Sequence, residues 1–123
     1  MENEQLYKRL QKSVKKYEPG ADDKLLKKVE TQCVYEEIDS KGLKFKQLRD
    51  KLMLLGSIME EDEKKNIYVA VVNAGAKNGN PCIMVANLLE DKVAVYAYAR
   101  EGLIKQHTAK KAVDKLKKEV KKK

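Results

Sequence analysis

The first part of the chain places apolar residues at helical spacing. Residues 1–17 carry one at every third or fourth position, and lysine and arginine lie mostly off that stripe, which predicts a basic amphipathic helix. The Glu-Pro-Gly sequence that follows is expected to end the helix, because proline disfavours the helical conformation of the residue before it. The apolar stripe consists of Leu6, Leu10, Val14 and Tyr17.

A second helical segment is expected over residues 22–55. Its first helix begins at Asp22 or Asp23, whose carboxylates suit the free amide groups and the positive end of a helix. We place the end of this helix near residue 38. Residues 33–38 could also be a short strand, since Val34, Glu36 and Ile38 alternate, so both structures remain open.

The other helix of this segment covers residues 44–55 and is expected to end at Gly56. The run Leu-Met-Leu-Leu widens its apolar face, so we expect this helix to be well buried. Its stripe has spacings of three, four and three, and it consists of Phe45, Leu48, Leu52 and Leu55.

Beyond Gly56 the pattern changes to short runs rich in β-branched and aromatic residues, which are typical of strands. Residues 57–99 therefore predict an antiparallel meander of three or four strands, and the whole chain predicts one small α+β domain. The three strong strands are residues 67–73, 82–89 and 93–99, and residues 57–61 are the candidate fourth strand.

The predicted sheet is apolar on both faces. In its last strand, Val93 and Val95 point to one side while Tyr96 and Tyr98 point to the other. A sheet with one solvated face would alternate apolar with polar residues, so each face here needs a cover. Helices of the same chain can provide it, and so can another subunit, which makes a homodimer one expected arrangement.

The last predicted element is a lysine-rich amphipathic helix over residues 106–121 with a frayed tail. Thr108 is a candidate N-cap. The stripe of mostly small apolar residues consists of Ala109, Ala112, Val113, Leu116 and Val120. The candidate nucleic-acid-binding residues are Lys110, Lys111, Lys115, Lys117, Lys118, Lys121 and Lys122.

Charge is concentrated at the two ends of this chain of 123 residues with net charge +8. Residues 105–123 hold nine lysines against two acids, and residues 1–17 hold five basic residues against two acids, whereas residues 18–104 are nearly neutral. We therefore expect a partner attracted by charge to bind at the ends. The chain has three arginines, none in the last helix, so any nucleic-acid binding should be weakly sequence-specific.

The composition favours a cytoplasmic protein with no membrane contact and no cofactor. No apolar run approaches the ~20 residues of a membrane span, and the polar start does not read as a secretory signal. Cys33 and Cys82 are far apart, which favours free thiols in a reducing compartment. Two cysteines and one histidine are too few for a zinc site, so no metal is predicted.

The glycine-rich segment 73–82 lacks the features of a phosphate-binding loop. No lysine and hydroxyl residue follow its second glycine, and the element behind it is a strand rather than a helix. We interpret it as a hairpin loop whose length leaves a binding role open. The candidate binding residues at its tip are Gly75, Lys77, Asn78 and Gly79.

Three other arrangements are weaker. The acidic run at residues 60–63 is typical of a solvated turn, or of a turn that pairs with a lysine-rich end of another copy. Cys82 and His107 would form a nucleophile and base only if the fold brought them together. The order of the segments from 22 to 67 matches the topology of a winged-helix module with residues 44–55 as recognition helix, although the wing tip would be acidic. That helix carries Lys44, Lys46, Arg49 and Lys51.

These patterns predict a non-enzymatic binding or assembly module that acts through contacts with a protein partner or with a second copy. The alternative is nucleic-acid binding through the lysine-rich last helix. An enzyme ranks third, because no catalytic constellation is present in the sequence.

Overall fold

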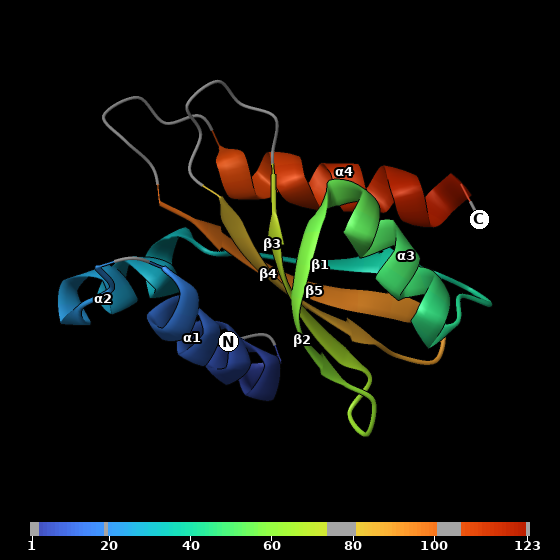
Figure 1. The fold of residues 1–123 in the computed structure, drawn as a ribbon, viewed down its shortest axis with the longest axis horizontal. Coiled ribbons are helices and arrows are strands. Elements are labelled where there is room, and N and C mark those ends of the chain that lie inside the picture. Colours follow the sequence, from blue (N-terminus) through green and yellow to red (C-terminus); the bar gives the residue numbers. More distant parts are fainter. Residues whose placement is uncertain (1–2, 19, 74–80, 101–106, 123) are drawn as a thin grey trace.

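The computed structural model describes residues 3–18, 20–73, 81–100 and 107–122 (Figure 1). These residues form four helices and one five-stranded antiparallel sheet. The predicted α+β class is confirmed, with one strand more than the upper expectation. In chain order the elements are α1 (Glu4–Tyr17), α2 (Asp23–Gln32), β1 (Val34–Asp39), α3 (Phe45–Leu55), β2 (Gly56–Asp62), β3 (Ile67–Val72), β4 (Cys82–Leu88), β5 (Lys92–Ala99) and α4 (Thr108–Lys122).

The strand order is β1-β5-β4-β3-β2, with every neighbouring pair antiparallel. Strands β2 to β5 form the predicted meander, and the fourth strand expected at residues 57–61 is β2. Strand β1 extends the meander by one strand, because it pairs with the outer edge of β5. The edges of the sheet are therefore β1 and β2.

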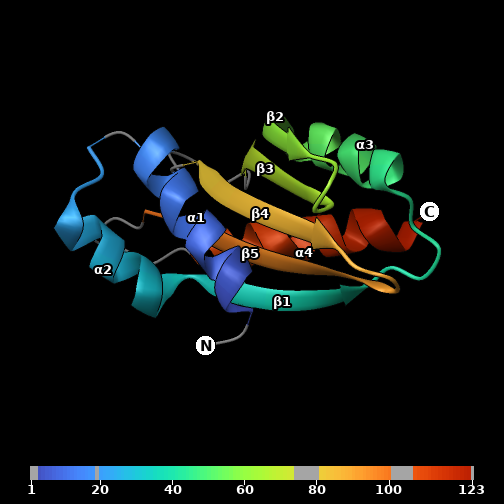
Figure 2. The ribbon, with the colours of Figure 1, turned by 90° about the horizontal axis from the view of Figure 1, so that it is seen from below.

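Both faces of the sheet are covered by helices of the same chain, α1 and α2 on one face and α3 and α4 on the other (Figures 1 and 2). We call these the α1 face and the α4 face. In β5, Val93 and Val95 pack on the α4 face while Tyr96 and Tyr98 pack on the α1 face, as the alternation predicts. The two-sided apolar sheet thus needs no second subunit to bury it.

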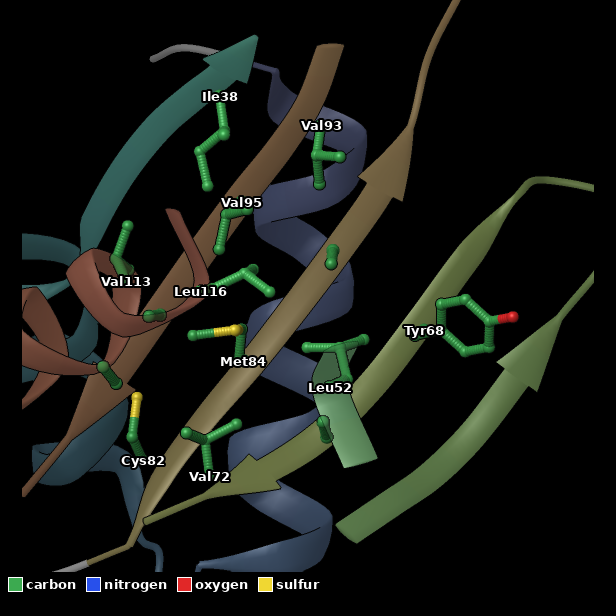
Figure 3. Close-up of a cluster of buried hydrophobic side chains, with 14 of the residues drawn as sticks. Ile38, Leu52, Tyr68, Val72, Cys82, Met84, Val93, Val95, Val113 and Leu116 are labelled. Carbon is green, nitrogen blue, oxygen red and sulfur yellow. The ribbon is translucent and has the colours of Figure 1, made fainter. Parts of the chain in front are cut away.

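The core of the α4 face brings residues of α3 and α4 onto the middle strands (Figure 3). Leu52 and Leu116 are fully buried there against Met84. Tyr68 of β3 stacks its ring on Phe45, with ring centroids 4.1 Å apart, and its hydroxyl donates a 2.9 Å hydrogen bond to the Phe45 carbonyl. Burial raises the pKa of Tyr68 to about 12, so this bond holds the start of α3 at every ordinary pH.

Residues 34–38 are a strand, so the helix expected to continue to residue 38 is wrong. Helix α2 ends at Gln32, and β1 pairs with β5 from Val34 to Asp39. Ile38 is buried on the α4 face, and Tyr35 packs its ring 4.6 Å from Tyr96 on the opposite face. The alternation of side chains matches the two faces of the sheet, and β5 supplies backbone hydrogen bonds that no local pattern reveals.

The winged-helix order is also wrong. A strand of the sheet lies between α2 and α3, and these helices pack on opposite faces of that sheet (Figure 2). Of the basic residues expected to read DNA, Arg49 is bound to Glu61, with 3.1 Å between the guanidinium Nε and the carboxylate.

Helix α3 is less buried than its apolar run suggests. Leu48 and Leu52 are fully buried, but Met53 and Leu54 remain 53% and 71% exposed. One turn of a helix has 3.6 residues, so the positions directly after Leu52 point away from the sheet. Only one side of α3 can face the core, and the extra apolar residues lie outside it.

The acidic run at residues 60–63 is mostly strand rather than a solvated turn. The pairing of β2 with β3 shifts register between Ile58 and Glu60, which makes Met59 a bulged residue. Ile58 therefore packs on the α4 face, whereas Glu60 and Asp62 face α1. Without this bulge all three would share one face, and the acids would enter the apolar core.

The acids of β2 bind cations of the same chain. Arg9 lies 3.3 Å from Asp62 and 3.7 Å from Glu60, and the Tyr17 hydroxyl donates a 2.5 Å hydrogen bond to Glu60. The Lys16 ammonium lies 3.3 Å from the same carboxylate. These contacts tie the basic side of α1 to the sheet edge, and they involve no second copy.

Gly56 joins α3 to β2 with extended backbone, and it lies very close to the backbone of the neighbouring strand β3. A Cβ at this position would lie 2.0 Å from the carbonyl oxygen of Val71 and 2.8 Å from the Cα of Val72. Both atoms are backbone, so a larger residue cannot be accommodated by rotation of a side chain. The glycine is required by this close approach rather than by its φ of −179°.

We expect Gly56→Ala to lower the free energy of unfolding by about 2–4 kcal/mol, because the start of β2 must separate from β3. Urea denaturation followed by circular dichroism measures the change. Ser57→Ala is the control, since Ser57 is exposed. Equal stability of Gly56→Ala and the native chain would contradict the close approach.

Candidate functional site

Helix α4 lies along the sheet on a stripe of mostly small apolar side chains. Contacts with β5, β1, β4 and α3 bury this stripe (Figure 1). Small residues let the helix approach closely, so the long side chains at the other positions are directed away from the sheet. The predicted stripe is confirmed in full, and its buried members are Ala109, Ala112, Val113, Leu116 and Val120.

Six of the seven lysines of α4 divide into two groups, and the seventh, Lys121, is exposed and belongs to neither. The first group is bound to acids of the same chain: Lys110 and Lys117 reach Glu36 of β1 at 3.4 and 3.0 Å. Lys110 also lies 2.8 Å from Asp114. These lysines hold the helix to the edge strand, and their charge is largely compensated.

The second group faces solvent. Lys111, Lys115 and Lys118 form no hydrogen bond or ion pair within the described part of the chain, and Lys122 pairs only with Glu119 of its own helix, at 3.1 Å. Their spacings of four, three and four residues place them on one side of α4, opposite the buried stripe. We call these four residues the lysine row.

The lysine row extends across most of the helix. Its first and last members are eleven positions apart, which corresponds to roughly 16 Å at 1.5 Å per residue. Cations near the C-terminus of a helix are also favoured by its dipole, so the last members of the row lie where positive charge costs least. The row is a continuous cationic surface rather than a pocket.

Glu36 couples β1 electrostatically to α4 through two lysines. The hydrogen bond from Lys117, together with the nearby charge of Lys110, holds the pKa of this carboxyl below its ordinary value, against the opposite effect of partial burial. A lowered native pKa means that ionised Glu36 stabilises the fold above its ordinary pKa of 4.5. That stabilisation is lost as the pH falls through the native pKa.

We expect Glu36→Gln to lower the free energy of unfolding by about 0.5–1 kcal/mol at pH 7, because two lysines lose their carboxylate. The difference from the native chain should shrink as the pH falls below 4.5 and vanish once native Glu36 is protonated. Urea denaturation at pH 7 and near pH 3 measures it. Glu30→Gln, which removes an exposed acid of α2, is the control.

The residues considered for nucleophilic catalysis lie in different environments. Cys82 is fully buried in the core of the α4 face, and His107 is exposed. His107 borders a depression of about 240 Å³ together with Val34 and Lys110, and Cys82 takes no part in it. Cys33 is a free thiol whose pKa is raised by burial, which disfavours its reactive thiolate.

Some of the predicted residues lie outside the part of the chain that the structure describes, and the predictions on metal ions and membrane spans can be compared only with the described residues. The candidate binding residues Gly75, Lys77, Asn78 and Gly79 lie outside them, as do residue 106 and the tail at residue 123. Among the described residues, no three His, Cys, Asp or Glu side chains are grouped so that they could hold a metal ion. No helix of that same part is long and apolar enough to cross a membrane.

No protein-family model matches the chain, and searches of curated proteins and of solved structures find no match.

The sequence identified the lysines of α4 but could not separate the two groups. The difference between the groups depends on Glu36. The sequence left open whether this residue belongs to a helix or a strand, and in the structure it lies on β1 and pairs with Lys110 and Lys117 of α4. The basic side of α1 was noticed for its charge alone, and its acidic partners on β2 were missed. The only signal for them was the high density of acids at residues 60–63.

Proposed function

We propose that this chain is a non-enzymatic binding module that binds the phosphate backbone of nucleic acid, with weak sequence specificity, through the lysine row of α4. The observation that carries the proposal is that Lys111, Lys115 and Lys118 share the side of the helix opposite the buried stripe and have no acidic partner in the described residues. Lysine is a strongly hydrated point charge suited to phosphate, whereas base reading is mainly the work of arginine, asparagine and glutamine.

The dimensions of the row suit a nucleic-acid strand. Phosphates of one strand of a duplex advance by 3.4 Å along the axis, so a row of roughly 16 Å faces about five of them. If the four lysines of the row contact phosphates, the logarithm of the binding constant should fall with the logarithm of salt concentration at a slope of about −4. The two acids of α4, Asp114 and Glu119, are each bound to a lysine and oppose this binding only weakly.

The triple variant Lys111→Gln, Lys115→Gln, Lys118→Gln should bind short DNA or RNA duplexes more weakly at low salt. Its salt slope should be smaller in magnitude by about 2–3, because each lysine releases nearly one counterion. Fluorescence anisotropy at several salt concentrations measures both quantities.

The matched control neutralises Lys24, Lys27 and Lys28 of α2, which are exposed and lie on the other face of the sheet. It removes the same total charge and should keep the native salt slope. Equal losses in both variants, or no binding by the native chain at low salt, would contradict a site on α4.

A second candidate function is protein binding through the exposed apolar residues of α3 and β2. Leu54, Met53 and Met59 are 71%, 53% and 42% exposed, and α3 packs directly against β2. Large exposed apolar side chains on neighbouring elements are a feature of protein-binding surfaces. This surface supports an assembly role better than the sheet faces, which are covered by the chain's own helices.

If these residues mediate self-association, the native chain should form larger species at micromolar concentration, and the double variant Met53→Ser, Leu54→Ser should not. The two substitutions remove apolar side-chain area whose burial would stabilise the contact between two copies. Light scattering coupled to gel filtration measures the mass. Leu89→Ser, which removes another exposed leucine at 37% exposure, is the control. A strictly monomeric native chain with no co-purifying partner would contradict the assembly role.

A further inference from the structure

On the α1 face, the surface is hollowed into a depression of about 480 Å³. It lies where the first half of α1 meets the turn between β2 and β3 and the end of β4. Leu6 and Ile67 contribute apolar surface, and the remaining side chains that line it are polar or cationic. Since α4 covers the opposite face of the sheet, this depression is separate from the lysine row (Figure 2).

Four cations from two distant segments converge on this depression. Lys8 and Arg9 are adjacent in α1, Lys12 lies one turn later, and Lys65 comes from the turn between β2 and β3. No carboxylate is among the described residues that line it. Concentrating like charges in a concave surface creates a positive potential that attracts an anion.

The cations differ in how they are held. The Arg9 guanidinium is fixed by Asp62 and Glu60, at 3.3 and 3.7 Å, so its charge is partly compensated. The ammonium groups of Lys8, Lys12 and Lys65 have no hydrogen-bond or ion-pair partner within the described residues. These three lysines therefore remain able to bind oxygen atoms of a ligand.

Asn87 adds an independent sign of a ligand. It lies in β4 between Ile67 of β3 and Ala94 of β5, both of which pack on the α1 face, and it lines the depression. Its Oδ1 atom is buried and accepts no hydrogen bond from any described residue. A buried amide oxygen without a donor is costly, so this position suits a ligand that offers a hydroxyl or amine proton.

We propose that this depression binds a small phosphate ester that carries a hydroxyl group, of the class of sugar phosphates. The phosphate oxygens accept hydrogen bonds from Lys8, Lys12 and Lys65, and a hydroxyl of the ligand donates to Asn87 Oδ1. A volume of about 480 Å³ lies within the range of sites for small ligands. The walls of the site are a helix, paired strands and the turn that carries Lys65, and the Asn87 side chain must rotate to present its buried Oδ1 to the ligand.

Isothermal titration calorimetry at low ionic strength tests the proposal with three probes: ribose 5-phosphate, inorganic phosphate and ribose. We expect saturable binding of ribose 5-phosphate to one site, weaker binding of inorganic phosphate and no binding of ribose. The double variant Lys12→Gln, Lys65→Gln should bind ribose 5-phosphate at least about tenfold more weakly, since each lysine provides a charge-assisted hydrogen bond.

Lys15→Gln with Lys64→Gln is the matched control. It removes one lysine from the same helix and one from the same turn, and neither residue lines the depression. This control should stay within about twofold of the native affinity, because only the long-range part of the charge is lost. Asn87→Ala should lose the preference for ribose 5-phosphate over inorganic phosphate while it keeps phosphate binding.

Three results would overturn the proposal. They are the absence of saturable binding of ribose 5-phosphate to the native chain, an equal loss of affinity in the control variant, and an unchanged preference in Asn87→Ala. Displacement of ribose 5-phosphate by a short oligonucleotide that binds more tightly would assign the depression to nucleic acid instead. Circular dichroism of each variant confirms that it is folded, so a loss of binding is not a loss of structure.

Discussion

The burial of the sheet on both faces is the constraint on which the rest of the structure depends. Strands β3, β4 and β5 are apolar on both sides, and their side chains alternate between two cores. Such strands are stable in water only when each face is covered. Four short amphipathic helices supply the cover from within one chain, two on each face (Figures 1 and 2).

The distribution of charge follows from this arrangement. Each helix buries one stripe, so its lysines must lie along its sides and its outer surface. Where a side meets an edge strand, acids bind the lysines: Glu36 of β1 binds α4, and Glu60 of β2 binds α1. Uncompensated cations remain on the outer side of α4 and in the depression beside the start of α1. Among the described residues, no acid pairs with Lys111, Lys115 or Lys118 in the first proposed site, or with Lys8, Lys12 or Lys65 in the second.

The same acids protect the edges of the sheet. Strands β1 and β2 each have one unpaired side, and an unpaired strand can pair with another chain. Glu36, Glu37 and Asp39 on β1, and the acids and the bulge at Met59 on β2, disfavour such pairing. The acids of the edge strands therefore have two effects: they bind lysines of the helices, and they limit the addition of another strand. The exposed apolar surface of the described residues lies on α3 rather than on a sheet edge.

The chain's local patterns determined most elements, because an amphipathic period or a β-branched run depends only on neighbouring residues. Helices α1, α3 and α4, the meander and the two faces of β5 were all predictable. They did not determine β1, since residues 34–38 alternate weakly and become a strand only when β5 provides hydrogen bonds. Nor did they show the bulge at Met59, which directs Glu60 and Asp62 toward α1. The lysines of α4 were visible in the sequence. Which of them remain free was decided by Glu36, a contact between residues about eighty positions apart that only the tertiary structure creates.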